Sequence, residues 1–222
     1  MKRKLKPYQL FLPIMVFLSS CLTTANFETG KTVGRGMIKN DIGINYEFSE
    51  PKRTGWFDFN EAPFVNYGFT YGVHDRVDIG FNLNMADLSL KTKVMLTKRT
   101  SPVSVSLGTS VYFLVGEDPL FRYYHSNLSL YTSLNPTDEF TLYLNPQVLF
   151  MTNGILENRA YAITVGFMFN KVFKTRRHNI GLGFEFTNHE MGIYKQHTFA
   201  VGVIIKRKKS YMKSRKKDPL FY

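Results

Sequence analysis

The stretch VNYGFTYGVHDRVDIGFNLN, residues 65–84, alternates bulky and small side chains on both sides of a polar break. Aromatic or aliphatic residues occupy every second position, and the residues between them are mostly Gly, Asn and Thr. This period of two is typical of β-strands that have two different faces. The break His74-Asp75-Arg76 is short, so the stretch predicts a β-hairpin. Alternation alone does not show whether the bulky face meets a protein core or lipid.

The same alternation recurs along most of the chain and predicts about ten strands. The segments are residues 41–48, 65–73, 77–84, 88–97, 103–113, 124–134, 140–148, 161–169, 180–186 and 199–205. Aromatic residues make up 15% of the chain and glycine occurs 16 times, which suits a strand-rich protein. No segment has the period of an amphipathic helix of three turns. We therefore expect an all-β fold.

The predicted connections alternate in length along the chain. Four are short and contain turn residues, namely 74–76, 98–102, 135–138 and 171–177. The others are mostly longer, at 49–62, 114–121, 151–158 and 188–195, with a short one at 84–88. Successive connections of an antiparallel meander lie at opposite ends of the sheet. We therefore expect one rim of tight turns and one rim of longer loops.

The composition of the polar face indicates what surrounds the sheet. It is largely Gly, Ser, Thr, Asn and Ala, whereas a face in water is usually rich in Lys, Glu, Asp and Arg. The bulky face has almost no charge and adds aromatic residues near strand ends, as lipid-facing bands do: Tyr46, Phe48, Phe113, Tyr124, Tyr161 and Phe186. We expect it to face lipid, and a closed barrel follows because open edges are costly in hydrocarbon. A soluble sandwich on a lipid tether is the structural alternative.

The N-terminus reads MKRKLKPYQLFLPIMVFLSSC, a basic stretch followed by an apolar run and small residues. That layout is typical of a secretory signal peptide, residues 1–20. Leu18-Ser19-Ser20-Cys21 resembles the lipobox of bacterial lipoproteins, which implies lipidation of Cys21 and handling by lipoprotein-sorting machinery. The alternative is an ordinary signal or an uncleaved anchor, with Cys21 as a free thiol.

Residues 36–206 resemble small bacterial outer-membrane β-barrel proteins. The resemblance implies an antiparallel up-and-down transmembrane barrel of about ten strands, inserted by barrel-assembly machinery among outer-membrane lipids. It divides the chain into a signal peptide (1–20), a lipidated tether (21–35), the barrel (36–206) and a basic tail (207–222). With the tight turns in the periplasm, an even strand number places both termini there.

Two other features of the chain predict no ligand. The formal net charge of +12 lies mainly at the two ends of the chain, so a nucleic-acid-binding face is not expected. Residues 25–32, ANFETGKT, match a loose phosphate-binding loop, but no strand leads into it and Gly34-Arg35-Gly36 breaks any following helix. No metal-ligand spacing is present, and no cofactor is expected.

Polar residues on the inward face are the candidate site residues, because a charged group in a narrow barrel needs a partner. They are Glu47, Asp78, Lys91, Lys93, His125, Asn127 and Glu185. A hairpin centred near 85–86 brings Lys93 opposite Asp78 or one step away, which predicts an internal ion pair. His125-Ser126-Asn127 lacks one residue of the His-x-Ser-Asn step of outer-membrane lipid A deacylases, and we expect His125 to be hydrogen-bonded inside the barrel.

The sequence favours a structural or interaction role in the cell envelope over an enzymatic one. A narrow barrel is filled by side chains or admits only small solutes, so a general porin is not expected. Two alternatives remain open: an enzyme that acts on lipid or peptide at the loop rim, and a narrow channel.

Overall fold

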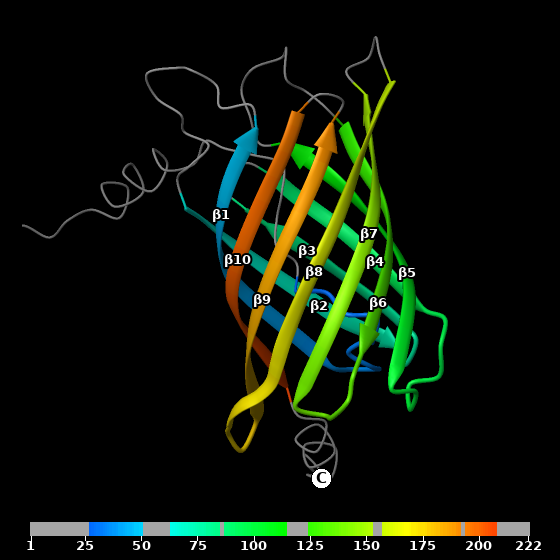
Figure 1. The fold of residues 1–222 in the computed structure, drawn as a ribbon. Helices are drawn as coiled ribbons and strands as arrows, with labels where there is room; N and C mark the ends of the chain where they lie inside the picture. Colours follow the sequence, from blue (N-terminus) through cyan, green and yellow to red (C-terminus); the bar gives the residue numbers. More distant parts are fainter. Residues whose placement is uncertain are drawn as a thin grey trace, which may run out of the picture.

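The protein forms a closed barrel of antiparallel strands, as a computed structural model shows for residues 27–50, 63–84, 87–114, 124–152, 157–191 and 194–207 (Figure 1). Within these residues the barrel has ten strands: β1 (Ile38–Glu50), β2 (Phe64–His74), β3 (Val77–Leu83), β4 (Asp87–Met95), β5 (Val103–Leu114), β6 (Tyr124–Leu134), β7 (Phe140–Thr152), β8 (Glu157–Lys174), β9 (His178–Met191) and β10 (Tyr194–Arg207). The predicted all-β, up-and-down barrel of about ten strands is confirmed.

The barrel closes where the first strand meets the last. Ile44 of β1 stands opposite Val65 of β2 on one side and opposite Val201 of β10 on the other. Each remaining strand pairs with its neighbours in the sequence. Closure gives every strand two partners, so the ring of strands has no unpaired edge.

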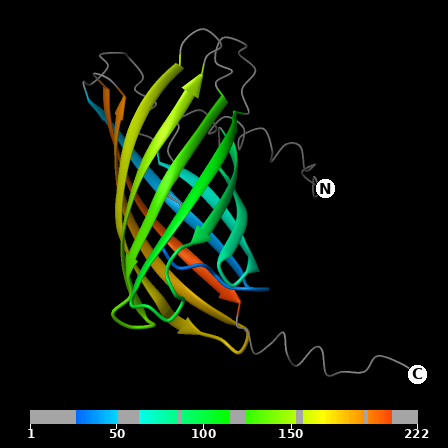
Figure 2. The same ribbon diagram turned by 90° about the vertical axis from the view of Figure 1, so that its right-hand side faces the viewer.

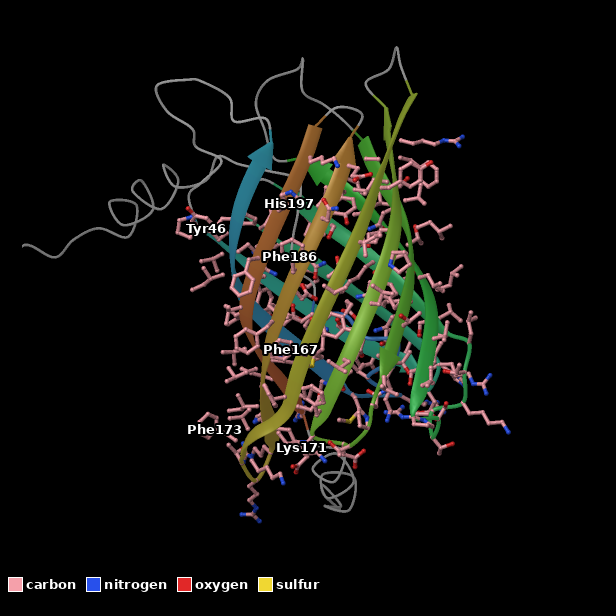
Figure 3. The ribbon with its side chains drawn as sticks, viewed as in Figure 1. Tyr46, Phe167, Lys171, Phe173, Phe186 and His197 are labelled. Atoms are coloured by element: carbon pink, nitrogen blue, oxygen red, sulfur yellow. The ribbon has the colours of Figure 1, made fainter. Side chains whose placement is uncertain are left out.

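The outer wall is apolar and exposed, as the alternation predicts. Ile44, in the middle of β1, is 58% exposed, and Leu107 in β5 is 43% exposed. Aromatic residues join them: the rings of Phe167 and Phe184 stack at 4.8 Å between centroids. Figure 3 shows Tyr46 and Phe173 projecting from the wall on one side of the barrel. An apolar surface that surrounds a closed barrel is suited to hydrocarbon rather than to water.

The two rims differ less than the sequence predicts. The connection between β7 and β8 is residues 153–156 instead of the expected 151–158. That between β9 and β10 is residues 192–193 instead of 188–195. The expected break at 171–177 shrinks to 175–177 because β8 continues to Lys174. These strands extend past the alternating apolar stretch, since backbone pairing does not require apolar side chains. Long connections remain after β1 and after β5, at 51–63 and 115–123.

The largest correction concerns the predicted tether at 21–35. Residues 27–34 lie inside the barrel at the short-turn end, where Figures 1 and 2 show the dark blue start of the described chain. Phe27 and Glu28 are 0% and 3% exposed. These residues are part of the barrel interior and not of a tether outside it, because side chains of the barrel wall hold them. Residues 1–26, including Cys21, and the tail from residue 208 lie outside the described residues.

Among the described residues, no helix is both long and apolar enough to cross a membrane.

A charge on the outer wall should disfavour the folded barrel. Leu107→Arg places a guanidinium near the middle of β5, and we expect it to lower the unfolding free energy in a lipid bilayer by about 2–4 kcal/mol. His74→Arg, which changes an exposed residue at the end of β2, is the control and should leave that free energy almost unchanged. Denaturant titration in vesicles measures both. Equal effects of the two variants would contradict a lipid-facing wall.

Candidate functional site in the barrel lumen

Residues 27–34, here called the lumenal segment, enter the barrel through a tight turn at the short-turn rim. Gly34 and Gly36 have φ angles of 93° and 70°, a left-handed region that glycine adopts without strain. The amide of Met37 donates to the carbonyl of Gly34 at 2.9 Å, and that of Gly36 donates to Gly72 of β2 at 2.7 Å. The turn therefore reverses the chain from the lumen into β1.

The ring of Phe27 rests on a row of three glycines. Gly43 of β1, Gly202 of β10 and Gly183 of β9 are direct neighbours across the strands. A Cβ added at Gly183 would lie 2.5 Å from the ring, and one at Gly43 would lie 2.8 Å from it. Glycine at these positions leaves the wall flat enough for an aromatic ring. The ring also belongs to an apolar cluster with Tyr143, Met168, Ala200 and Ile204.

Glu28 binds three lysines that come from two strands. Its carboxylate lies 3.0 Å from the Nζ of Lys39 in β1, 2.7 Å from that of Lys91 and 2.6 Å from that of Lys93, both in β4. All four side chains are at most 7% exposed. Charge-assisted hydrogen bonds of this length are the strong class, and burial removes competing water. Glu28 thus links the lumenal segment to the strands on both sides of the hairpin β2–β3.

Two aspartates of the wall complete this cluster of charges. Asp41 lies 3.2 Å from Lys39, and Asp78 lies 3.6 Å from Lys93. The strands alone therefore supply three ammonium groups against two carboxylates, an excess of one positive charge in a buried place. The carboxylate of Glu28 balances that excess. The wall of the barrel is thus electrostatically incomplete without the lumenal segment.

Backbone contacts hold the rest of the segment. The amide of Val33 donates to Asp78 at 3.0 Å, and the hydroxyl of Thr32 donates to the carbonyl of Asp75 at 2.7 Å. The side chain of Asn145 in β7 donates to the carbonyl of Glu28 at 2.7 Å. These bonds satisfy backbone groups that a strand pairing would otherwise satisfy. The segment is therefore bound along its length, and not only through the side chains of Phe27 and Glu28.

The structure brings together three of the candidate residues named from the sequence. Asp78, Lys91 and Lys93 all belong to the Glu28 cluster, and the predicted pair of Asp78 with Lys93 is present. The register explains it, since Asp78 stands directly opposite Lys93 between β3 and β4. The hairpin between these strands thus fixes half of the cluster.

Two further candidates lie elsewhere in the lumen. Asn127 of β6 donates to Tyr112 at 3.0 Å and to Gln147 at 3.1 Å. Glu185 of β9 accepts from the hydroxyl of Tyr143 at 2.8 Å. The side chains of Glu47 and His125, in β1 and β6, lie outside the described residues.

Sequence reasoning missed Phe27, Glu28 and Lys39. Phe27 and Glu28 stand in a stretch without period two, and a partner for the lysines was sought only among strand residues. One signal was available: away from the long-loop rim, Lys39, Lys91 and Lys93 outnumber Asp41 and Asp78 at the inward positions of β1, β3 and β4. Such an excess indicates that a buried anion comes from outside the sheet.

The described residues hold no group of three or more His, Cys, Asp or Glu side chains placed to bind a metal ion. The enzyme alternative puts its residues at the long-loop rim, and most of the connections there lie outside the described part of the chain. The described residues thus form a barrel with an internal plug, which is the lumenal segment.

No protein-family model matches the chain, and no curated protein matches it. Solved structures that resemble it include Ail, the attachment invasion locus protein of Yersinia pestis, at 10% identity and a TM-score of 0.36, covering 78% of this chain and 99% of that one. Neisserial surface protein A resembles it at 8% identity and 0.34, covering 78% and 96%. OprG from Pseudomonas aeruginosa resembles it at 8% identity and 0.26, covering 81% and 98%. Likenesses this low carry no argument about activity.

Removing the charge of Glu28 should destabilise the barrel strongly. Glu28→Gln leaves three buried ammonium groups with two carboxylates, and we expect a loss of about 3–5 kcal/mol in unfolding free energy. Denaturant titration in vesicles measures it.

Glu139→Gln is the matched control for that substitution. Lys174 donates to the exposed Glu139 carboxylate at 3.0 Å and lowers its pKa, but water screens this pair. We expect no measurable change for the control. Equal losses in the two variants would show that the Glu28 cluster does not hold the fold together.

Proposed function

We propose that this protein is an outer-membrane barrel closed by its own N-terminal segment, with a structural or interaction role in the cell envelope rather than a transport role. The observation that carries the proposal is the lumenal segment itself, bound by Glu28 to three lysines and by Phe27 to the glycine row. A segment held by buried charge pairs is a permanent part of the lumen, because releasing it would leave those charges unpaired.

The other half of the lumen supports a closed barrel as well. Asn127 of β6 donates to Tyr112 of β5 and to Gln147 of β7. Leu149, Ala160 and Ala162 form a separate buried apolar cluster on β7 and β8. Side chains thus narrow the interior beyond the lumenal segment, as expected for a barrel little wider than the eight-stranded ones.

We further propose an orientation in the outer membrane with the short-turn rim in the periplasm. The turns at this rim are those between β2 and β3, β4 and β5, β6 and β7, and β8 and β9, and β10 ends there. The basic tail from residue 208 then begins in the periplasm, and the longer connections at 51–63 and 115–123 face outward to meet partners. Insertion would use the barrel-assembly machinery, and a lipidated Cys21 would use lipoprotein sorting.

Conductance in planar bilayers tests the closed state. We expect the full chain to give no steady single-channel current, whereas Phe27→Ala/Glu28→Ala, which removes both anchors of the lumenal segment, should give intermittent currents. Glu139→Ala, at the exposed rim, is the control and should stay silent. Heat-modifiable migration in gels verifies that each variant is folded. Steady currents from the unchanged protein would favour the narrow-channel alternative, and a silent double variant would show that the segment is not what closes the barrel.

Lipidation of Cys21 is tested separately. Phe27 lies six positions after Cys21, a span of at most about 22 Å, so a lipid on Cys21 would be tied closely to the lumenal segment. We expect incorporation of a labelled fatty acid in cells, abolished by Cys21→Ala, while the barrel still resists alkaline extraction from membranes. Extraction of the Cys21→Ala barrel would instead favour a soluble domain on a lipid tether.

A further inference from the structure

A cavity of about 290 Å³ lies at the short-turn end of the barrel, beside the lumenal segment. The segment forms one side of it, and residues of β7 to β10 and of the turn between β6 and β7 form the other. The bonds of the segment near the rim explain this placement. Val33 and Thr32 bond to β3 and to the turn before it, and Gly30 accepts a bond from Ser106 of β5. Near the rim the segment therefore fills the β2–β5 side and leaves the β7–β10 side hollow.

The cavity is lined by more positive than negative side chains. Its cationic members are Lys31, Lys39, Lys93, Arg99, Lys171 and Lys206, and its acidic members are Glu28 and Asp138. Lys39 and Lys93 are neutralised within the Glu28 cluster. Arg99 and Lys171 have exposed partners at 3.4 and 3.6 Å, which screen them weakly.

Lys206 and Lys31 are the two remaining lysines of the lining. The Nζ of Lys206 donates to Asn170 at 2.8 Å and lies 4.0 Å from the sulfur of Met168. Within the described ranges, no carboxylate lies at ion-pair distance from either lysine. An ammonium group has three hydrogens to donate, so Lys206 keeps donors for another acceptor.

Neutral side chains hold Lys206 in place. Asn170, which accepts from Lys206, donates to Thr141 at 2.8 Å, and Thr141 donates to Asn135 at 2.9 Å. This chain of hydrogen bonds crosses the cavity wall from β10 through β8 and β7 to the turn after β6. The ammonium is thus positioned by a built polar wall, as a ligand-binding group requires.

We propose that this cavity binds a small phosphorylated anion. A phosphate group carries close to two negative charges and several acceptor oxygens, which match two lysines that have no carboxylate partner in the described residues. Figure 3 places Lys171 at the short-turn end, where a ligand would enter. A soluble phosphate ester and the headgroup of an anionic phospholipid share this chemistry. The site lies beside the plug and does not depend on whether the barrel conducts.

Calorimetric titration with inorganic pyrophosphate tests the proposal, using the full chain in a neutral detergent at low salt. Lys206→Gln removes one charge-assisted contact and should weaken binding about tenfold or more. The matched control is Lys98→Gln, an exposed lysine of the β4–β5 connection that does not line the cavity, and it should bind as the unchanged protein does.

Thermal unfolding separates loss of binding from loss of folding. Because Lys206 has no acidic partner among the described residues, K206Q should unfold no earlier than the unchanged protein without ligand. Pyrophosphate should raise the unfolding temperature of the unchanged protein and of K98Q, but raise that of K206Q less. Equal weakening in K206Q and K98Q, or no binding up to about 1 mM pyrophosphate, would overturn the proposal.

A competition experiment identifies the source of the phosphate. The protein is placed in phosphatidylcholine vesicles, with or without phosphatidylglycerol, and titrated with pyrophosphate. Weaker apparent pyrophosphate binding in the phosphatidylglycerol vesicles, lost in K206Q, assigns the cavity to a lipid headgroup. Unchanged binding assigns it to a soluble phosphate ester.

Discussion

The structure depends on one constraint: backbone groups in a wall that faces hydrocarbon must pair with other backbone groups of the same wall. The pairing of β1 with β10 meets it by leaving no edge. Closure also gives each strand two different faces, because alternate side chains then point to lipid and to a narrow lumen. The exposed Ile44 and the buried Asn45 beside it are the local result of that rule.

The lumen of this barrel is built for an occupant. Three glycines in one row make room for a ring, and three lysines against two aspartates leave a charge that the wall cannot balance. Phe27 and Glu28 meet both needs with adjacent residues. Packing and electrostatics thus select the same segment, which is why we treat the plug as part of the fold and not as a removable arm.

The lumenal segment occupies the short-turn end of the lumen asymmetrically, and this asymmetry leaves a cavity there. Near the rim the segment bonds to the β2–β5 side, so the opposite side keeps a cavity with Lys206 and Lys31 on it. Farther from that rim, the neutral side chains of Asn127 and Gln147 are hydrogen-bonded to each other. Together, the two proposals describe a closed barrel with a lysine-lined cavity at its short-turn end.

The sequence by itself determined that the chain forms a barrel and that the bulky face of its strands meets lipid. Period two survives in every strand because one face meets lipid and the other the lumen, and the hairpin register placed Asp78 opposite Lys93. Local pattern could not determine the plug, since residues 27–34 have no period and Glu28 lies 63 residues from Lys91 in the chain. Strand ends at β8 and β9 were also misjudged, because backbone pairing continues where the apolar pattern stops. Only the closed tertiary structure decided what fills the lumen, because the width of the barrel and the charge inside it exist only once all ten strands have met.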